Sequence, residues 1–365
     1  MLDARALASY DSNVAAGDAT VAALRRLKKE DNTYTLGTTA TFQVPSSRLS
    51  FYAIGSADFE RHQKNSNLDA DNYIVTLGGT AQMGACNGTL VGDYSHRLAL
   101  LADLTVPVAR NIVDQESANV NVTCGRRSIF GSLGGGYTKL MNDARTTTFI
   151  DSSTRSVQGA LGYQNKTLGS VALTGEYSEI HYEDDPLAPS PSDRVDQFSG
   201  GISYTRKIGN RLSGNAAVNY TRIEPNGGQD SSGAFGADVA LTYRASPRLN
   251  LALDYTLANN ASSAADAAYV RTGAFRVTGN YRLNTRISVN AAFSKGRSDY
   301  KGGQAIPGLQ LRKSDDTTIS GGAAMKIGRK ISLTLDASHT DRKADLTQFN
   351  YRSDRVAIGI TGSFF

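Results

Sequence analysis

The sequence contains no tryptophan, only two cysteines and no long apolar run. Its longest apolar segment, LALLADL at 98–104, is far shorter than the run of about 18 residues that marks a membrane-spanning helix. This shortage excludes a helical membrane protein. It leaves either a soluble protein or a membrane β-barrel, because the strands of a membrane barrel are apolar only at every second residue.

Metal-binding and catalytic patterns are also absent from the sequence. The two cysteines do not form a CxxC pair, and the histidines are scattered without the spacing of metal ligands. No order of serine, histidine and aspartate resembles a catalytic triad, and SLGGGYTKL (132–140) lacks the GKS or GKT ending of a phosphate-binding loop. We therefore predict no enzyme activity, no metal and no cofactor. The four histidines are His62, His96, His181 and His339. His339 lies on the predicted outer face, and we interpret it as an ordinary surface histidine in preference to a catalytic residue of a lipid-modifying barrel enzyme.

Neither sign of charge dominates. The 39 basic and 34 acidic residues give a net charge of +5 and are interspersed along the chain. A nucleic-acid partner would require a concentrated basic patch, so we predict none.

What the sequence does contain is glycine, tyrosine and a strict two-residue alternation. There are 36 glycines and 17 tyrosines. In 249–257 one phase is apolar and the other is small or polar: Leu249, Leu251, Leu253, Tyr255 and Leu257 against Asn250, Ala252, Asp254 and Thr256. Similar pairs of runs, each joined by a short turn, recur about every 40 residues, marked by Tyr163, Tyr204, Tyr243 and Tyr281. A period of this length also occurs in propellers and solenoids, but two strands of about ten residues per repeat are the hairpin unit of a transmembrane barrel.

The predicted fold is therefore all-β: one transmembrane antiparallel up-and-down β-barrel spanning residues 1–365. The alternation predicts about 18 strands, with 16 as the alternative because the first strand is the weakest. The expected strands lie near 3–15, 32–44, 48–61, 70–83, 88–103, 115–124, 127–142, 152–165, 169–183, 194–207, 211–225, 233–246, 248–260, 268–283, 286–299, 312–327, 330–345 and 353–365.

Short turns and longer loops alternate between these strands, which sets an orientation. We expect the outer membrane of a Gram-negative bacterium, with the C-terminus and turns such as 208–210, 246–247 and 284–285 in the periplasm and the longer loops outside. MLDARALASY shows no apolar signal segment, so no signal peptide is expected in this chain. In the first external loop, 16–31, helix-spaced apolar residues and the basic run AALRRLKKED (22–31) suggest a short amphipathic helix that could contact lipopolysaccharide. Arg222 and Arg271 are further candidate lipopolysaccharide contacts, and DDPLAPSPSD (184–193) is expected to be a solvated loop in preference to a calcium site.

The two phases of alternation predict two sets of residues. Outward aromatic residues near both rims predict two girdles at the membrane interfaces, although tryptophan is missing from them. The predicted girdle residues are Tyr163, Tyr177, Tyr204, Tyr220, Tyr243, Tyr255, Tyr281, Phe293 and Phe364. Polar inward residues predict a wet lumen, and their charges either contact solute or pair with one another to brace the wall. The predicted pore-lining residues are Glu176, Asn215, Asn219, Asp238, Arg244, Asn250, Asp254, Arg276, Arg282, Asn290 and Asp336.

Two further features bear on assembly. Cys86 and Cys124 fall at the turns of adjacent hairpins on the periplasmic side, where an oxidising compartment favours a disulfide. The chain ends on the alternating strand DRVAIGITGSFF, which predicts a closing strand that pairs with the first. Its phase places Phe364 outward and Phe365 toward the lumen.

YDSNV (10–14), the hairpin repeat, the paired cysteine turns and the terminal aromatic together resemble the β-barrel porin family that accompanies exopolysaccharide synthesis and export genes. The resemblance covers nearly the whole chain. It implies an outer-membrane exit for polysaccharide, a periplasmic export protein docking below, and assembly by the barrel-assembly machinery, which reads a C-terminal aromatic. Outer-membrane lipid and lipopolysaccharide are the other expected partners.

Three functions remain open at this stage: an exopolysaccharide export pore, a passive diffusion porin for small hydrophilic solutes, and a barrel enzyme or structural anchor. The mostly short loops disfavour a porin with a long constriction loop, and the missing catalytic pattern disfavours an enzyme. The absence of a basic stripe predicts an exported polymer that is neutral or of mixed charge.

Overall fold

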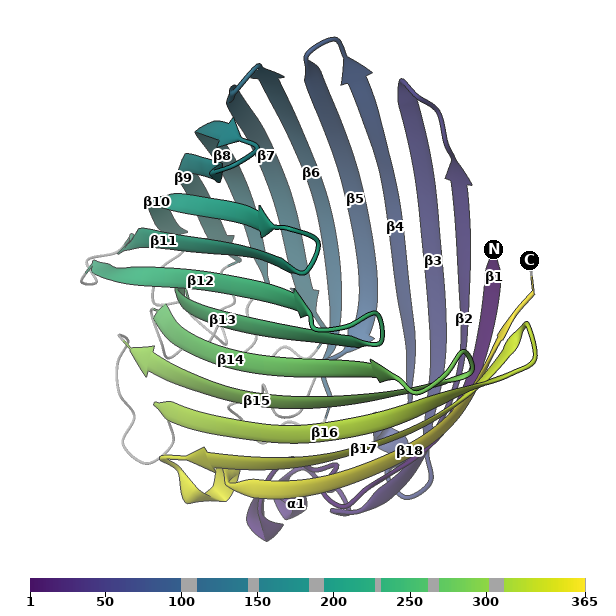
Figure 1. Cartoon of the computed structure of the whole chain (residues 1–365). Coiled ribbons are helices and arrows are strands. Elements are labelled where there is room, and N and C mark those ends of the chain that lie inside the picture. Colours follow the sequence, from purple (N-terminus) through teal and green to yellow (C-terminus); the bar gives the residue numbers. More distant parts are fainter. Residues whose placement is uncertain are drawn as a thin grey trace.

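The computed structural model describes residues 1–99, 110–143, 151–183, 194–226, 231–261, 269–301 and 312–364. Within these ranges eighteen antiparallel strands each pair with the next along the chain, and β1 pairs with both β18 and β2, so the sheet closes into a barrel (Figure 1). The strands are β1 (Leu2–Asp11), β2 (Asp31–Val44), β3 (Leu49–His62), β4 (Ala70–Met83), β5 (Cys86–Leu98), β6 (Ile112–Arg126), β7 (Ile129–Asn142), β8 (Ser152–Asn165), β9 (Gly169–Tyr182), β10 (Arg194–Ile208), β11 (Leu212–Pro225), β12 (Ser232–Arg244), β13 (Leu249–Ala261), β14 (Tyr269–Arg282), β15 (Ile287–Lys301), β16 (Lys313–Ile327), β17 (Ile331–Ala344) and β18 (Tyr351–Ser363).

The predicted fold class and the count of 18 strands are confirmed, and the alternative of 16 is wrong. The predicted first strand, 3–15, is too long, because β1 ends at Asp11. There the Asp11 side chain accepts a hydrogen bond from the Asn13 amide at 2.7 Å, and the Asn13 side chain donates to the Gly17 carbonyl at 3.0 Å. These local bonds turn the chain away from the sheet.

The barrel has two unlike ends. One end, here called the short-turn end, carries both termini and the tight turns between even-numbered strands and the odd-numbered strands that follow them (Figure 1). The last strand meets the first there, where the Phe364 amide donates to the Leu2 carbonyl at 2.8 Å. Gly209 and Gly328 adopt positive φ angles of 59° and 88° in two of these turns, a conformation that glycine takes without steric cost. The other end, the loop end, carries the longer connections. Phe365 and the loop 184–193, for which a lumen-facing position and a solvated loop were predicted, lie outside the described residues.

The clusters of buried apolar residues in the described part of the chain also lie at the loop end. The connection 12–30 includes helix α1 (Ala19–Leu24), which begins at an Asp18 cap that accepts from the Val21 amide. Leu27 and Ala22 pack against Leu68, the last residue of the short 3₁₀ helix η1 (Ser66–Leu68), and Val21 packs against Phe349 of η3 (Thr347–Phe349). The loop 12–30 therefore rests on two neighbouring loops. None of the helices in the described ranges is long and apolar enough to cross a membrane.

Register assigns every strand residue to one of two faces, because paired residues of neighbouring strands share a face. The outer face holds the apolar phase, for example Leu173 opposite Ile202 and Ile202 opposite Val218, and these side chains are more than half exposed. The inner face holds the polar phase, for example Thr205 opposite Asn215. The wall is thus a single layer whose apolar side faces outward, the reverse of a soluble β-sandwich.

Candidate functional site

The inner face of the wall is the candidate site, and the structure places all the predicted pore-lining residues on it. Register joins several of them directly: Asp254 lies opposite Arg276, Asn250 opposite Arg244, and Glu176 opposite Ser199. The complete set shares this face: Glu176, Asn215, Asn219, Asp238, Arg244, Asn250, Asp254, Arg276, Arg282, Asn290 and Asp336. Contact with a solute stays a prediction for each of them.

Inward glycines allow polar side chains of alternate strands to meet across the strand between them. Arg5 of β1 and Asp58 of β3 form two hydrogen bonds of 3.0 and 2.7 Å, passing over Gly37 of β2. Asn121 and Gln158 approach the inner side of Gly134 in the same way, at 3.0 and 3.1 Å from the position of an added Cβ atom. The sequence alone does not reveal the Arg5–Asp58 pair, because its members lie far apart in the chain. This pair shows that part of the inner polar phase braces the wall.

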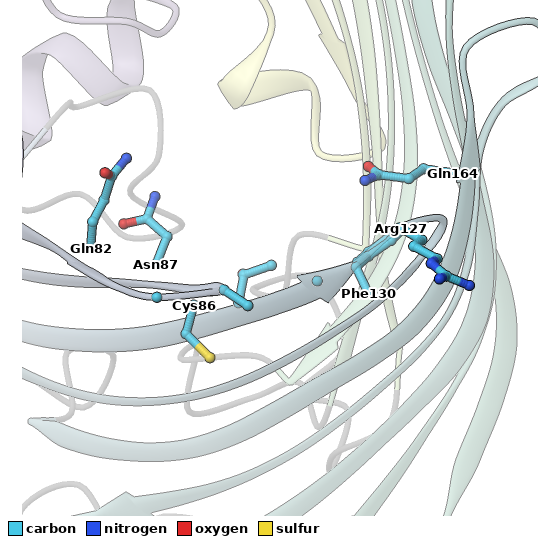
Figure 2. Close-up of a pocket in the computed structure, with 10 residues that line it drawn as sticks. Gln82, Cys86, Asn87, Arg127, Phe130 and Gln164 are labelled. Atoms are coloured by element: carbon cyan, nitrogen blue, oxygen red, sulfur yellow. The ribbon is translucent and has the colours of Figure 1, made fainter.

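A groove rich in amide side chains lies on the inner wall at the short-turn end, beside the disulfide, and Arg127 is its one charged lining residue (Figure 2). The groove has a volume of about 530 Å³, and its lumen-facing side chains include Gln82, Asn87, Thr123 and Gln164. Figure 2 shows Gln82 and Asn87 pointing to one side of the wall and the sulfur of Cys86 to the other. Cys86 is bonded to Cys124, its direct partner in register across β5 and β6. The predicted disulfide is thus present, and it lies on the outer face.

The predicted girdle residues all lie on the outer face, in two rows. Tyr163, Tyr204, Tyr243, Tyr281 and Phe364 are near the short-turn end, and Tyr177, Tyr220, Tyr255 and Phe293 are toward the loop end. In the second row, ring centroids are 5.0 Å apart for Tyr177 and Phe198 and 5.2 Å apart for Tyr220 and Phe235. The girdles predicted from the sequence omit the outward aromatic residues of β2 to β7 that extend both rows, although alternation within those strands was the available signal. They are Phe42 and Phe51 in the first row and Tyr34, Phe59, Tyr73, Tyr94 and Tyr137 in the second.

Beyond the second row, the outer face carries charged side chains that pair with one another. Arg194 lies 3.1 Å from both Asp196 and Glu179, and His96 lies 2.7 Å from Asp114. His339 bonds Asp354 at 2.7 Å, an arrangement that an ordinary surface ion pair explains. Arg222 pairs with Glu224 at 2.6 Å, and Arg271 lies opposite Asp299 in register. A lipopolysaccharide contact by either arginine stays a prediction.

A buried polar cluster joins the loop 12–30 to the wall at the loop end. Asp31 is fully buried and accepts hydrogen bonds from the backbone amides of Lys64 and Asn65 and from the Asn65 side chain. His62 lies 3.3 Å from Asp31 and 3.4 Å from Glu60. Burial opposes the charged form of His62, but Glu60 and Asp31 outweigh it and raise the pKa of the imidazole. Burial likewise opposes ionisation of Asp31, but its hydrogen bonds from Lys64 and Asn65 and the charge of His62 lower its pKa.

Comparison with known proteins identifies this architecture. Residues 197–364 match the family described as "Putative beta-barrel porin 2". The predicted resemblance to a β-barrel porin family is confirmed by this match, which covers the segment from β10 to the end of β18. No curated protein sequence matches the chain.

Solved structures with the same fold come from several outer-membrane barrels. The siderophore receptor PirA from Acinetobacter baumannii aligns with a TM-score of 0.52 and 8% identity over 99% of this chain and 80% of its own. The outer membrane protein opdK from Pseudomonas aeruginosa aligns with a TM-score of 0.50 and 10% identity over 100% and 99% of the two chains. OccAB3 from Acinetobacter baumannii gives 0.50 and 11% over 100% and 98%. At these identities the likeness concerns the fold, which is that of an outer-membrane porin or transporter barrel.

Proposed function

We propose that this barrel is an outer-membrane pore through which a hydrated exopolysaccharide is exported. The observation that carries the proposal is the inner wall of a closed 18-strand barrel. The inward-facing positions of its strands hold hydroxyl, amide and charged side chains. Barrels of this strand number enclose an aqueous channel. Alternating amides and hydroxyls offer hydrogen bonds to the hydroxyl groups of a sliding sugar chain. The match to a porin family supports a pore. The sequence features that resemble exopolysaccharide-associated porins support the choice of cargo.

The longest described connection is held in place at the loop end of the barrel. Residues 12–30 are the longest stretch between consecutive strands. This segment is attached to neighbouring loops through contacts of Asp18 with Gln348, Lys28 with Asn65, and Val21 with Phe349. Tyr300 and Ala344, which register places on the inner face, also pack against the cluster of Val21 and Phe349. The segment therefore lies over part of the inner face at the loop end, away from the short-turn end where the proposed polymer enters.

The orientation and partners follow from the same proposal. The short-turn end faces the periplasm and receives the polymer from a periplasmic export protein, while the loop end faces outward. The two aromatic rows lie at the two membrane interfaces, and lipopolysaccharide contacts the charged band beyond the second row. The barrel-assembly machinery inserts the chain, and the proposed role includes no catalysis.

Deleting the chain's gene tests the proposal. We expect the deletion strain to lose secreted polysaccharide while making normal or increased amounts of polymer inside the cell, and a plasmid copy to restore secretion. Unchanged secretion in the deletion strain would contradict the proposal. Loss of polymer synthesis as well as secretion would also contradict a role limited to export.

A passive diffusion porin is the second candidate, favoured by full-length alignment with opdK and OccAB3. It predicts that purified barrels make liposomes permeable to small sugars at rates that fall with sugar size. It also predicts that deletion slows uptake of small hydrophilic solutes without affecting polysaccharide secretion.

A further inference from the structure

Basic residues gather at the short-turn end of β10 to β17. Four successive turns there, in the segments 205–213, 242–250, 280–288 and 324–332, contain ten lysines and arginines and no aspartate or glutamate. In each segment one basic residue precedes the turn and another immediately precedes the first outward apolar residue of the next strand. The first three turns contribute Lys207, Arg211, Arg244, Arg248, Arg282 and Arg286, which we call the basic arc. Lys326 and Lys330 continue the same pattern at the fourth turn.

The basic arc belongs to the inner face of the wall. Lys207 lies opposite Ser213, Arg244 opposite Asn250, and Arg282 opposite Ser288, and all three pairs are in the lumen phase. Backbone bonds connect one hairpin to the next, because the Arg244 amide donates to the Arg211 carbonyl at 2.7 Å and the Arg282 amide donates to the Arg248 carbonyl at 2.8 Å. Neighbouring strands are about 5 Å apart, so the arc is a continuous row of positive charge and not a set of isolated residues.

No carboxylate of the described part of the chain neutralises the basic arc. All six side chains are exposed, and none takes part in an ion pair among the described residues. The first lumen carboxylates on these strands, Asp238 and Asp254, lie six residues along their strands from Arg244 and Arg248. A row of like charges of this kind attracts anions to the entrance, most strongly at low ionic strength.

The surroundings of the basic arc suit a sugar. Lys207, Arg211 and Arg244 line a groove of about 590 Å³ together with Asn210, Thr242, Asn250 and Asn280. These amides and hydroxyls are hydrogen-bonding groups for sugar hydroxyls, and the guanidinium groups match carboxylate geometry. On the opposite side of the barrel, the groove near Cys86 is lined mainly by neutral amides (Figure 2). Arg127 is the one charged residue of that lining, so the amides of this groove can bind the neutral sugars of the polymer.

We propose that the basic arc binds the acidic sugar residues of an anionic polysaccharide as it enters the lumen from the short-turn end. This inference rests on the export function proposed above and narrows its cargo to polymers with carboxylate-bearing sugars. It replaces the expectation, drawn from the sequence, of a neutral or mixed-charge polymer. Lipid phosphate is excluded as the ligand because these side chains are on the inner face, away from lipid. A protein docked on the rim would not require Arg244 or Arg282 at positions that face the lumen.

The first test is single-channel recording in planar bilayers with purified barrels, using oligogalacturonate as the acidic probe and maltodextrin of equal length as the neutral one. We expect oligogalacturonate to block the wild-type current and the K207Q/R244Q/R282Q variant to need at least ten times more of it. Block by maltodextrin should not change. The matched control is R155Q/K295Q/K343Q, which removes three positive charges from the outer face at the loop end and should behave as the wild type. Equal block of the variant and the wild type by oligogalacturonate overturns the inference, as does an equal effect of the control.

The second test separates this inference from the proposed function. In the deletion strain, wild-type and control genes should restore secretion, and the arc variant should restore only a small fraction of it at equal barrel amounts in the outer membrane. If deletion itself leaves secretion unchanged, the export function fails. If deletion abolishes secretion but the arc variant restores it fully, the function stands and the arc inference fails. Lost secretion combined with unchanged block by oligogalacturonate would assign the arc to an acidic partner protein and overturn the inference as well.

Discussion

Arg5 of β1 and Asp58 of β3 are joined by a two-bond salt bridge that passes over Gly37 of β2, inside the lumen and next to the β1–β18 closure. The glycine is required because a Cβ atom at position 37 would collide with the Asp58 carboxylate and would lie 2.7 Å from the Arg5 Nε atom. The seam where the two ends of the chain meet is therefore braced from within.

We expect Gly37→Val to break this brace and to lower the unfolding temperature of the barrel more than Arg5→Ala does. Arg5 is about half exposed, so removing its charge should cost only about 0.2–1 kcal/mol. Valine adds the steric displacement of both partners. The measurement is the temperature at which the folded barrel converts to the slower-migrating unfolded form on a gel. Gly55→Val is the control, because Gly55 faces outward with no atom within 4 Å of an added Cβ. Equal losses in the two valine variants would contradict the role of the salt bridge.

Reducing the Cys86–Cys124 disulfide should destabilise the barrel without unfolding it. The bond closes a chain separation of 38 residues, for which loop-closure entropy gives about 4 kcal/mol as an upper figure. We expect dithiothreitol to lower the unfolding temperature of the wild type to that of Cys86→Ser. The double variant C86S/C124S should match the single variant and should not respond to dithiothreitol. A further drop in the double variant would show that the thiols contribute separately.

The attachment of loop 12–30 should depend on pH through His62 and Asp31. The raised pKa of His62 means that its stabilisation is complete below the ordinary value of 6.5 and is lost as pH rises through the folded-state pKa. The lowered pKa of Asp31 means that its stabilisation is present above 3.8 and is lost as pH falls through the folded-state pKa. Attachment should therefore be tightest at weakly acidic pH.

Hydrogen exchange of the amides in 12–30 and 63–69 measures this dependence. After correction for intrinsic rates, exchange should become faster as pH rises from about 5.5 to about 8.5. His62 faces Asp31 and Glu60, and its own amide donates to Asp69 at 2.7 Å, so these carboxylates set the response. The variant His62→Gln should exchange faster at low pH and lose the pH dependence. An unchanged pH profile in this variant would rule out His62 as the titrating group.

Alternation alone predicted all the strands because each outward residue must meet lipid-like surroundings and each inward residue water, and this requirement repeats at every second position. It could not predict the end of β1, because the side-chain bonds of Asp11 and Asn13 override the pattern there. It also could not reveal the basic arc. Arg211, Arg248 and Arg286 are about 37 residues apart in the chain, and only hairpin pairing places them in one row. The same holds for Asp31 and His62, which meet only when β2 and β3 pair.

Because the chain has no tryptophan, a single introduced tryptophan is the sole source of tryptophan fluorescence and can report its depth in the membrane. Single variants Tyr204→Trp, Leu173→Trp and Tyr255→Trp place a fluorophore in the first aromatic row, between the rows and in the second row on the outer face. In vesicles with lipids brominated at different depths, we expect shallow bromines to quench the two row positions best and deep bromines to quench position 173 best, because aromatic rows lie at membrane interfaces about 25 Å or less apart. Asn219→Trp, on the inner face, should respond to aqueous iodide and not to brominated lipid. If position 219 were quenched by lipid, or if the three outer positions gave one depth, the assignment of faces and girdles would be wrong.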